Sequence, residues 1–326
     1  MLNSIRIFAY ILPTILIITI INLQGCDFSD IKPKSTTGDL KVVADENIKQ
    51  LMIAEEKEFE RLNPEANIEY QFMATREVTA ALINGDVSVA VVVGGLTEEE
   101  FNIANEHNVK IDSFAIAVDG VGFIVNPENP IERVTSEDLK KIFTGKVNQW
   151  SQVKTQDEEQ NTQIMSKMTG KNSSIKIFVP NLRSDFYTYI RDTLLNGEDY
   201  SSRVIICKTG GEIVDSVRKY ENAIGISNLG WLGTGNQDIL DSTVKPLRVS
   251  RIFPNGFQDD FRQFHQGLVF NSEYSFRRVV YAFSTEQGIK LSTGFITFLT
   301  NKDGQKVVLK EGMVPVTQPV RTVQIN

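Results

Sequence analysis

The chain has 326 residues, 41% hydrophobic and 23% charged, a composition typical of one large or two ordinary folded domains and unlike disordered or collagen-like chains. Its 34 basic and 41 acidic residues give a net charge of −7, which argues against nucleic acid as the main partner, because phosphate backbones attract positive surfaces. Two cysteines, Cys26 and Cys207, cannot hold a small disulfide-rich fold together, and two histidines exclude a His-rich metal centre. We therefore expect neither a metal nor a cofactor.

The first 25 residues have the features of a secretory signal. Residues 7–23 carry no charge, and Arg6 precedes them. The run ends in Leu-Gln-Gly-Cys26, which resembles a bacterial lipobox, whose cysteine takes a lipid after cleavage. A single membrane-spanning anchor is the alternative, since about 20 apolar residues span a bilayer. We expect residues 1–25 to be a signal peptide, Cys26 to carry a lipid anchor, residues 26–38 to form a polar tether, and the rest to be extracytoplasmic.

From residue 39 onwards the chain is expected to alternate between strands and helices. Asp45 or Asn47 can cap the first helix, and Pro64 ends it, because proline cannot continue a helix. The continuous apolar run at 87–93 is typical of a strand that is buried on both faces. Strands are expected at 40–44, 68–72, 87–93 and 114–118, with helices at 45–63, 77–84 and 97–105 between them.

The middle and last parts of the chain continue this alternation. Residues 135–138 read Thr-Ser-Glu-Asp, a capping box that opens a helix, and Gly145 closes it. The polar residues 151–174 are expected to be mostly loop. This pattern is typical of a doubly wound α/β sheet. Further strands are expected at 121–125, 175–179, 223–227, 244–249, 267–270 and 276–283, and further helices at 135–143, 184–195, 210–220, 289–299 and 303–310.

Catalytic motifs are incomplete. Residues 225–229 read Gly-Ile-Ser-Asn-Leu, whereas a hydrolase nucleophile elbow requires glycine in the fifth place. Residues 120–122 read Gly-Val-Gly, but Val125 stands where a dinucleotide-binding pattern has its third glycine. His265 lies among phenylalanines and is expected to pack rather than act as a base, and Cys207 is expected to be a buried small side chain. We therefore expect a protein without enzymatic activity.

One segment carries a specific resemblance. Residues 114–150 contain Asp119-Gly120 before an apolar run, then Asn-Pro-Glu-Asn-Pro at 126–130, a capped helix ending in Ile-Phe-Thr-Gly145, and Trp150. This segment closely resembles the signature of extracytoplasmic phosphate-binding proteins of ABC importers, the PstS type. Four further segments resemble the same family in the same order, so that the likeness covers most of residues 40–320. They are residues 84–97, 175–187, 222–227 and 295–315.

The resemblance implies an α/β fold of two lobes, a periplasmic-binding-protein clamshell in which each lobe is a mixed sheet flanked by helices. The chain would cross between the lobes twice, near 118–122 and near 223–226. Lobe one would hold residues 39–119 and 227–326, and lobe two residues 120–226. The implied function is the capture of phosphate or a related oxyanion between the lobes, by a monomer that delivers it to an ABC transporter permease.

The ligand loops depart from the family pattern. The first loop of the family is rich in Ser, Gly and Thr, whereas this chain has Asp45 and Glu46 there. A carboxylate beside a captured anion is unfavourable unless it points away or is protonated. Four residues remain as expected anion contacts: Thr75, Arg76, Arg183 and Ser184.

Simpler roles compete with these assignments. Ser184 could serve only as a helix cap, and the two arginines could be surface charges. Two functional hypotheses also stay open beside oxyanion capture. The same fold could be retuned to a cationic or polyhydroxylated ligand or serve as a surface sensor or adhesion module, and an enzyme on this scaffold is the third.

Overall fold

The computed structural model describes residues 35–236 and 239–317. The expected signal peptide, the expected lipid site at Cys26 and most of the expected tether lie outside these residues. Within the described ranges, no helix combines the length and apolar character needed to cross a membrane.

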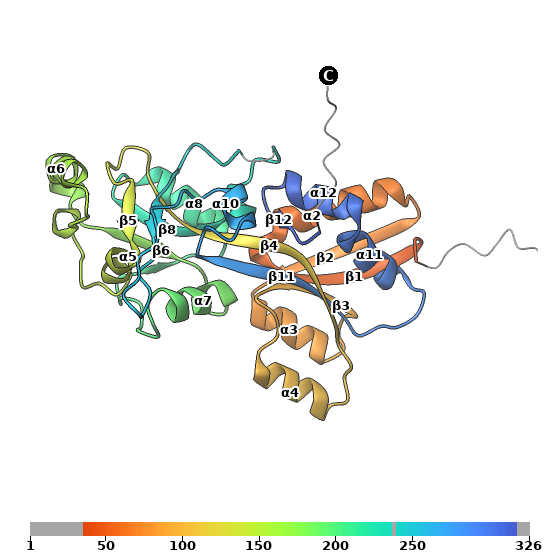
Figure 1. Ribbon diagram of the computed structural model, residues 1–326. Coiled ribbons are helices and arrows are strands. Elements are labelled where there is room, and N and C mark those ends of the chain that lie inside the picture. Colours follow the sequence, from red (N-terminus) through yellow and green to blue (C-terminus); the bar gives the residue numbers. More distant parts are fainter. Residues whose placement is uncertain (1–34, 237–238, 318–326) are drawn as a thin grey trace, which may run out of the picture.

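Ten strands of the described chain form one sheet that runs the length of the molecule (Figure 1). At one end, the parallel strands β1 (Gly38–Asp45), β2 (Ala66–Met73) and β3 (Val89–Val93) lie side by side. Strand β11 (Arg277–Ser284) pairs antiparallel with β3 and then with β4 (Asp112–Val125). The apolar strand β3 is buried along its whole length, as expected from its sequence.

Strand β4 continues into the other end of the sheet. Its second half pairs with β8 (Ala223–Asn228), which is followed by β6 (Lys176–Val179) and β7 (Ile205–Ile206). The short strands β9 (Lys245–Pro246) and β12 (Val314–Pro315) also pair with β4. The separate strands predicted at 114–118 and 121–125 are therefore one strand, which joins the two halves of the molecule.

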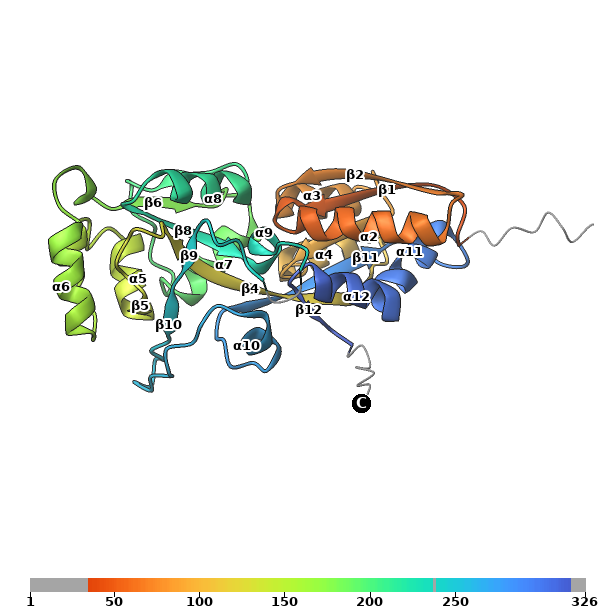
Figure 2. The same cartoon turned by 90° about the horizontal axis from the view of Figure 1, so that it is seen from above.

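Helices cover both faces of each half (Figure 2). We call β1–β3 with α2, α3, α4, α11, α12 and their loops the first lobe, and β6–β8 with α5, α6, α7, α8 and their loops the second lobe. The first-lobe helices are α2 (Lys49–Leu62), α3 (Thr75–Ile83), α4 (Glu98–Glu106), α11 (Leu291–Thr300) and α12 (Lys302–Lys310). The second-lobe helices are α5 (Ser136–Phe143), α6 (Glu158–Lys167), α7 (Asp185–Thr193) and α8 (Gly210–Lys219).

Short elements complete the fold. They are α9 (Leu229–Leu232), α10 (Gln266–Phe270), the 3-10 turns η2 (Glu46–Ile48), η3 (Trp150–Gln152) and η4 (Gly170–Asn172), and the two-stranded sheet of β5 (Arg133–Thr135) with β10 (Arg248–Ser250). The expected lobe boundaries remain a proposal. Because β10 pairs with β5 beside α5, we propose that lobe two also includes the segment of β9 and β10.

Two secondary-structure predictions are wrong. The segment 151–174 contains α6, whose start is capped by Asp157, but only Gln160 and Ile164 of its side chains are buried, so its apolar pattern is weak. The run 267–270 belongs to α10 and not to a strand, since the His265 side chain accepts a hydrogen bond from the N–H of Gly267 and caps a helical turn. Short apolar runs do not distinguish strand from helix.

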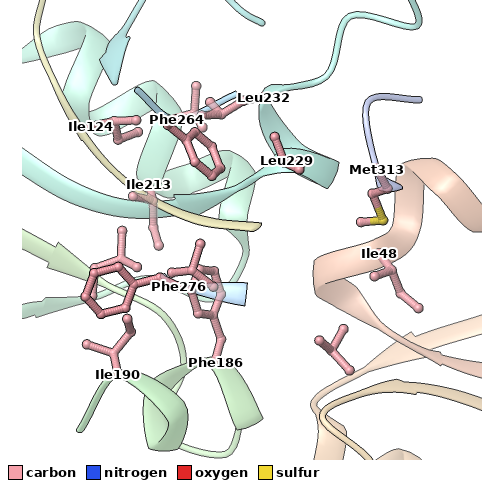
Figure 3. Close-up of a cluster of buried hydrophobic side chains, with 14 of the residues drawn as sticks. Ile48, Ile124, Phe186, Ile190, Ile213, Leu229, Leu232, Phe264, Phe276 and Met313 are labelled. Atoms are coloured by element: carbon pink, nitrogen blue, oxygen red, sulfur yellow. The ribbon is translucent and has the colours of Figure 1, made fainter. Parts of the chain in front are cut away.

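The hydrophobic core continues from one lobe into the other. Figure 3 shows part of it, with Ile213 and Phe276 on one side and Ile48 and Met313 on the other. A smaller cluster on the opposite face of the first-lobe sheet includes Val43, Val78, Leu82 and Phe283. Both faces of the first-lobe sheet are therefore packed, as a doubly wound sheet requires. The shared core holds the strand ends of both lobes at one place.

Candidate ligand-binding cleft

Three segments meet where the lobes face each other. Strand β1 ends at Asp45, α3 begins at Thr75 directly after β2, and α7 begins after its N-cap residue Ser184, which follows β6. The carboxyl ends of neighbouring strands in an α/β sheet lie at the same edge, where ligands of such folds bind. Sequence-distant polar residues are therefore brought together here.

Asp45 lies at the centre of this group. Its side chain is fully buried, and its carboxylate accepts hydrogen bonds from three donors of the first lobe. The backbone N–H of Asn47 donates over 2.9 Å and the side-chain Nδ2 of Asn47 over 2.8 Å. The third donor is the hydroxyl of Thr75. An oxyanion of the protein itself is thus surrounded by amide and hydroxyl donors.

The same donors reach the second lobe. Asn47 Nδ2 also donates to Ser184 Oγ over 2.9 Å, and Thr75 Oγ1 accepts from the backbone N–H of Asp185 over 3.0 Å. Ser184 Oγ additionally accepts from the N–H of Phe186 and so caps α7. The carboxylate of Asp45 is therefore connected to the start of α7 by two paths, one through the side chain of Asn47 and one through the side chain of Thr75.

The four residues predicted as anion contacts divide into two pairs. Thr75 and Ser184 are buried and belong to the group around Asp45. The guanidinium of Arg183 forms an ion pair with Glu77 of the first lobe over 2.7 Å, with side chains that are 69% and 44% exposed. Arg76 is exposed on α3. The role of all four as ligand contacts stays a prediction.

A buried arginine of β11 was not foreseen. The side chain of Arg278 is 2% exposed, and its guanidinium lies 3.3 Å from an oxygen of Asp119 and 3.3 Å from an oxygen of Asp185. It also lies 4.3 Å from the ring centre of Phe186. Asn228 Nδ2 donates to Asp119 over 2.7 Å. An arginine inside an apolar strand pattern is a signal that could have identified this position.

Burial dominates the electrostatics of the centre formed by Asp45, Asp119, Asp185 and Arg278. It raises the pKa of Asp119 to about 6, although Arg278 and Asn228 oppose the shift. Burial also raises the pKa of Asp45 and that of Asp185, against the hydrogen bonds to Asp45 and the guanidinium beside Asp185. Among the described residues of this centre, three carboxyl groups face one guanidinium. Burial therefore disfavours three simultaneous negative charges here, while the hydrogen bonds from Thr75 and Asn47 and the charge of Arg278 favour the charged form of Asp45.

A cavity of about 420 Å³ opens beside this group, between the two lobes. Its walls include Asp45, Glu46, Glu77 and Phe72 of the first lobe and Asn181, Ser184, Lys208 and Thr209 of the second. Three carboxyls and one ammonium group thus line it. Arg76 and Arg183 are not part of its lining. Within residues 35–236 and 239–317, no group of His, Cys, Asp and Glu could hold a metal ion.

A glycine permits the close approach of the lobes at this point. Gly94 follows β3 with φ +94°, a conformation that side chains rarely adopt. A Cβ atom there would lie 2.5 Å from a carboxylate oxygen of Asp185. The side chain of Asp185, in the first turn of α7, therefore packs directly against the backbone of the first lobe.

Comparison with known proteins agrees with this architecture. The phosphate-binding protein PstS of Pseudomonas aeruginosa is 24% identical over 296 residues, which is 89% of this chain and 86% of the relative. The phosphate-binding protein PstS of Borreliella burgdorferi is 23% identical over 259 residues, 79% of this chain and 83% of that relative. These relatives are binding proteins and not enzymes, as we expected for this chain.

Solved structures show the same fold. A candidate phosphate ABC transporter substrate-binding protein from Clostridium perfringens, with bound phosphate, matches with a TM-score of 0.69 at 20% identity and covers 86% of this chain and 100% of that one. An ABC-type phosphate transport receptor from Vibrio cholerae matches with a TM-score of 0.61 at 17% identity over 85% and 100%. The two-lobed α/β fold is thus confirmed. A family model described as a PBP superfamily domain matches residues 32–303, and the chain belongs to that superfamily of binding proteins.

Proposed function

We propose that the protein is an extracytoplasmic solute-binding protein that captures phosphate or a related oxyanion for an ABC importer. One observation carries the proposal: Asn47 and Thr75 of the first lobe donate to an oxyanion, the Asp45 carboxylate, and the same two side chains contact Ser184 and the N–H of Asp185 at the start of α7. The nine-residue helix α7 also directs the positive end of its dipole there, which favours a negative charge at this place. The names of the related phosphate-binding proteins support the choice of anion.

The cavity offers donors on the second-lobe side. The oxygen of Ser184 accepts hydrogen bonds from Asn47 and Phe186, which leaves its own hydrogen for a ligand oxygen. The ammonium group of Lys208 adds a positive charge at the same wall. Hydrogen phosphate can in turn donate its proton to a carboxylate such as that of Glu46. Closure around the ligand would be a hinge motion at the linking strand β4.

Calorimetric titration tests this function. Protein freed of carried-over ligand is titrated with inorganic phosphate, and we expect saturable binding of one phosphate per chain. Removing a hydrogen bond to a charged ligand costs about 1.5–3 kcal/mol, so Ser184→Ala should weaken binding about tenfold to hundredfold. Thr193→Ala is the matched control, because its hydroxyl lies at the other end of α7 and donates to the carbonyl of Tyr189. Absence of heat at millimolar phosphate would reject the proposal.

The acidic lining favours a second candidate function, the capture of a cationic or polyhydroxylated ligand. Asp45, Glu46 and Glu77 would bind an amine or several hydroxyl groups through charge-assisted hydrogen bonds. A thermal-shift screen of amines, sugars and oxyanions separates the two candidates. A higher melting temperature with amines or sugars alone would replace the oxyanion proposal, and a shift with oxyanions alone would eliminate the second candidate.

We also propose that the mature protein is a monomer held on the bacterial membrane by a lipid on Cys26, with residues 26–38 as its tether. Metabolic labelling with a fatty-acid analogue tests the anchor. The label should be present on the wild type and absent from Cys26→Ser. Cys207→Ser is the matched control, since Cys207 is the only other cysteine and is buried in the fold. Label that persists on Cys26→Ser would contradict the anchor.

A further inference from the structure

We propose that Asp45 is the specificity-determining residue of this cleft, because its carboxylate occupies from within the chain the place that a captured anion must take. The inference rests on the proposed function and identifies the residue that sets the affinity of that site for its ligand. A ligand oxyanion then competes with a tethered one, and the strength of binding depends on how readily Asp45 gives way.

The hydrogen-bond arrangement shows why the two compete. The two hydrogens of the Asn47 side-chain amide go to Asp45 and Ser184, and the single hydroxyl hydrogen of Thr75 goes to Asp45. The N–H of Asp185, at the start of α7, is bound to Thr75. While Asp45 keeps this position, the donors of Asn47 and Thr75 are not free for an incoming anion.

Helix capping alone does not account for this arrangement. Asp45 is the N-cap of η2, and the bond from the Asn47 N–H is the one that a cap makes. The bond from Thr75 is different, because Thr75 belongs to another helix and in turn holds the first turn of α7 in the second lobe. Serine or asparagine would cap the turn equally well. The carboxylate therefore does more than the cap requires.

Charge strengthens the competition. The groups that act on Asp45 are the guanidinium of Arg278, which attracts it, and the carboxyls of Glu46 and Asp185, which repel it. A phosphate placed among Asp45, Glu46 and Asp185 meets the same repulsion. Neutralising Asp45 removes both an occupant of the site and a like charge next to the ligand, so the two effects act in the same direction.

Phosphate titration of Asp45 variants is the first test. Asp45→Ser keeps the cap but is too short to hold Thr75, and Asp45→Asn keeps the shape without the charge. We expect both to bind inorganic phosphate about tenfold or more tightly than the wild type. Glu69→Gln is the matched control, because it removes an exposed carboxyl of β2 that is not part of the cavity lining and should leave the affinity unchanged. Thermal melting confirms that each variant is folded.

Refilling the position with a small carboxylate is the second test, and it does not depend on phosphate. Formate should raise the melting temperature of Asp45→Ala and leave the wild type unchanged, while the surface variant Asp303→Ala reports any general salt effect. Rescue by formate without phosphate binding by any variant would reject the proposed function and retain the role of Asp45. Folded Asp45 variants that show neither rescue nor tighter phosphate binding would overturn the inference, whatever the wild type binds.

Discussion

Replacing Arg278 with methionine tests the buried charge network beside the cleft. The guanidinium is 2% exposed and lies 3.3 Å from a carboxylate oxygen of Asp119 and 3.3 Å from one of Asp185. Methionine keeps an unbranched stem against the ring of Phe186 but removes the charge. Breaking a buried ion pair by removing one partner costs about 3–5 kcal/mol, so the free energy of unfolding near pH 7.5 should fall by that amount.

The cost should depend on pH through Asp119. Its folded pKa of about 6 lies above the ordinary value of 3.8, so the folded state holds a proton that the unfolded state releases. The stabilisation that this proton gives is present at a pH near 3.8 and is lost as the pH rises through the folded pKa of about 6. Arg278 lowers this pKa, and its removal raises it further. Near pH 5 the Asp119 carboxyl is then neutral, and the variant should lose less stability than near pH 7.5.

Urea unfolding followed by tryptophan fluorescence measures both effects. The wild type, Arg278→Met and the double variant with Asp119→Asn are compared at the two pH values. The double variant should recover part of the loss, because it no longer buries an unpaired carboxylate. Arg277→Met is the matched control at an exposed neighbouring position and should cost at most about 1 kcal/mol. A loss below about 1 kcal/mol for Arg278→Met, or a larger loss near pH 5, would refute the reasoning.

Three further predictions concern the fold. Gly225→Ala places a methyl group 2.6 Å from Ile213 Cγ2 of α8, which should cost about 1–3 kcal/mol and lower the thermal midpoint; an unchanged midpoint would show that α8 moves freely. Burial raises the pKa of Glu55 well above its usual range, so the wild type loses stability as the pH rises, and Glu55→Gln should be the more stable form near pH 8; parallel pH profiles would disprove this. Trp150→Phe removes the indole hydrogen bond of 3.1 Å to the Asn222 carbonyl and should cost about 1–3 kcal/mol in urea unfolding, whereas equal midpoints would count against a role for that bond.

Part of the candidate site followed from the resemblance of the ligand loops. That resemblance pointed to Thr75 and Ser184, and both lie in the group around Asp45. The two arginines were selected by charge and neighbourhood alone, and Arg183 instead forms an exposed ion pair with Glu77. Arg278 was missed, because its partners Asp119 and Asp185 are 159 and 93 residues away in sequence.

The sequence alone determined most of the strands and helices, since apolar periodicity and caps act over a few residues. The buried run of β3 and the capping boxes at Thr97 and Thr135 depend only on neighbours in the chain. Only the tertiary structure decided what Asp45 does. As a lone carboxyl in a ligand loop it repels an anion, but its contact with Thr75, 30 residues away, makes it the bound anion of its own site. That contact exists because the sheet places the ends of β1 and β2 side by side and folds α7 of the second lobe against them.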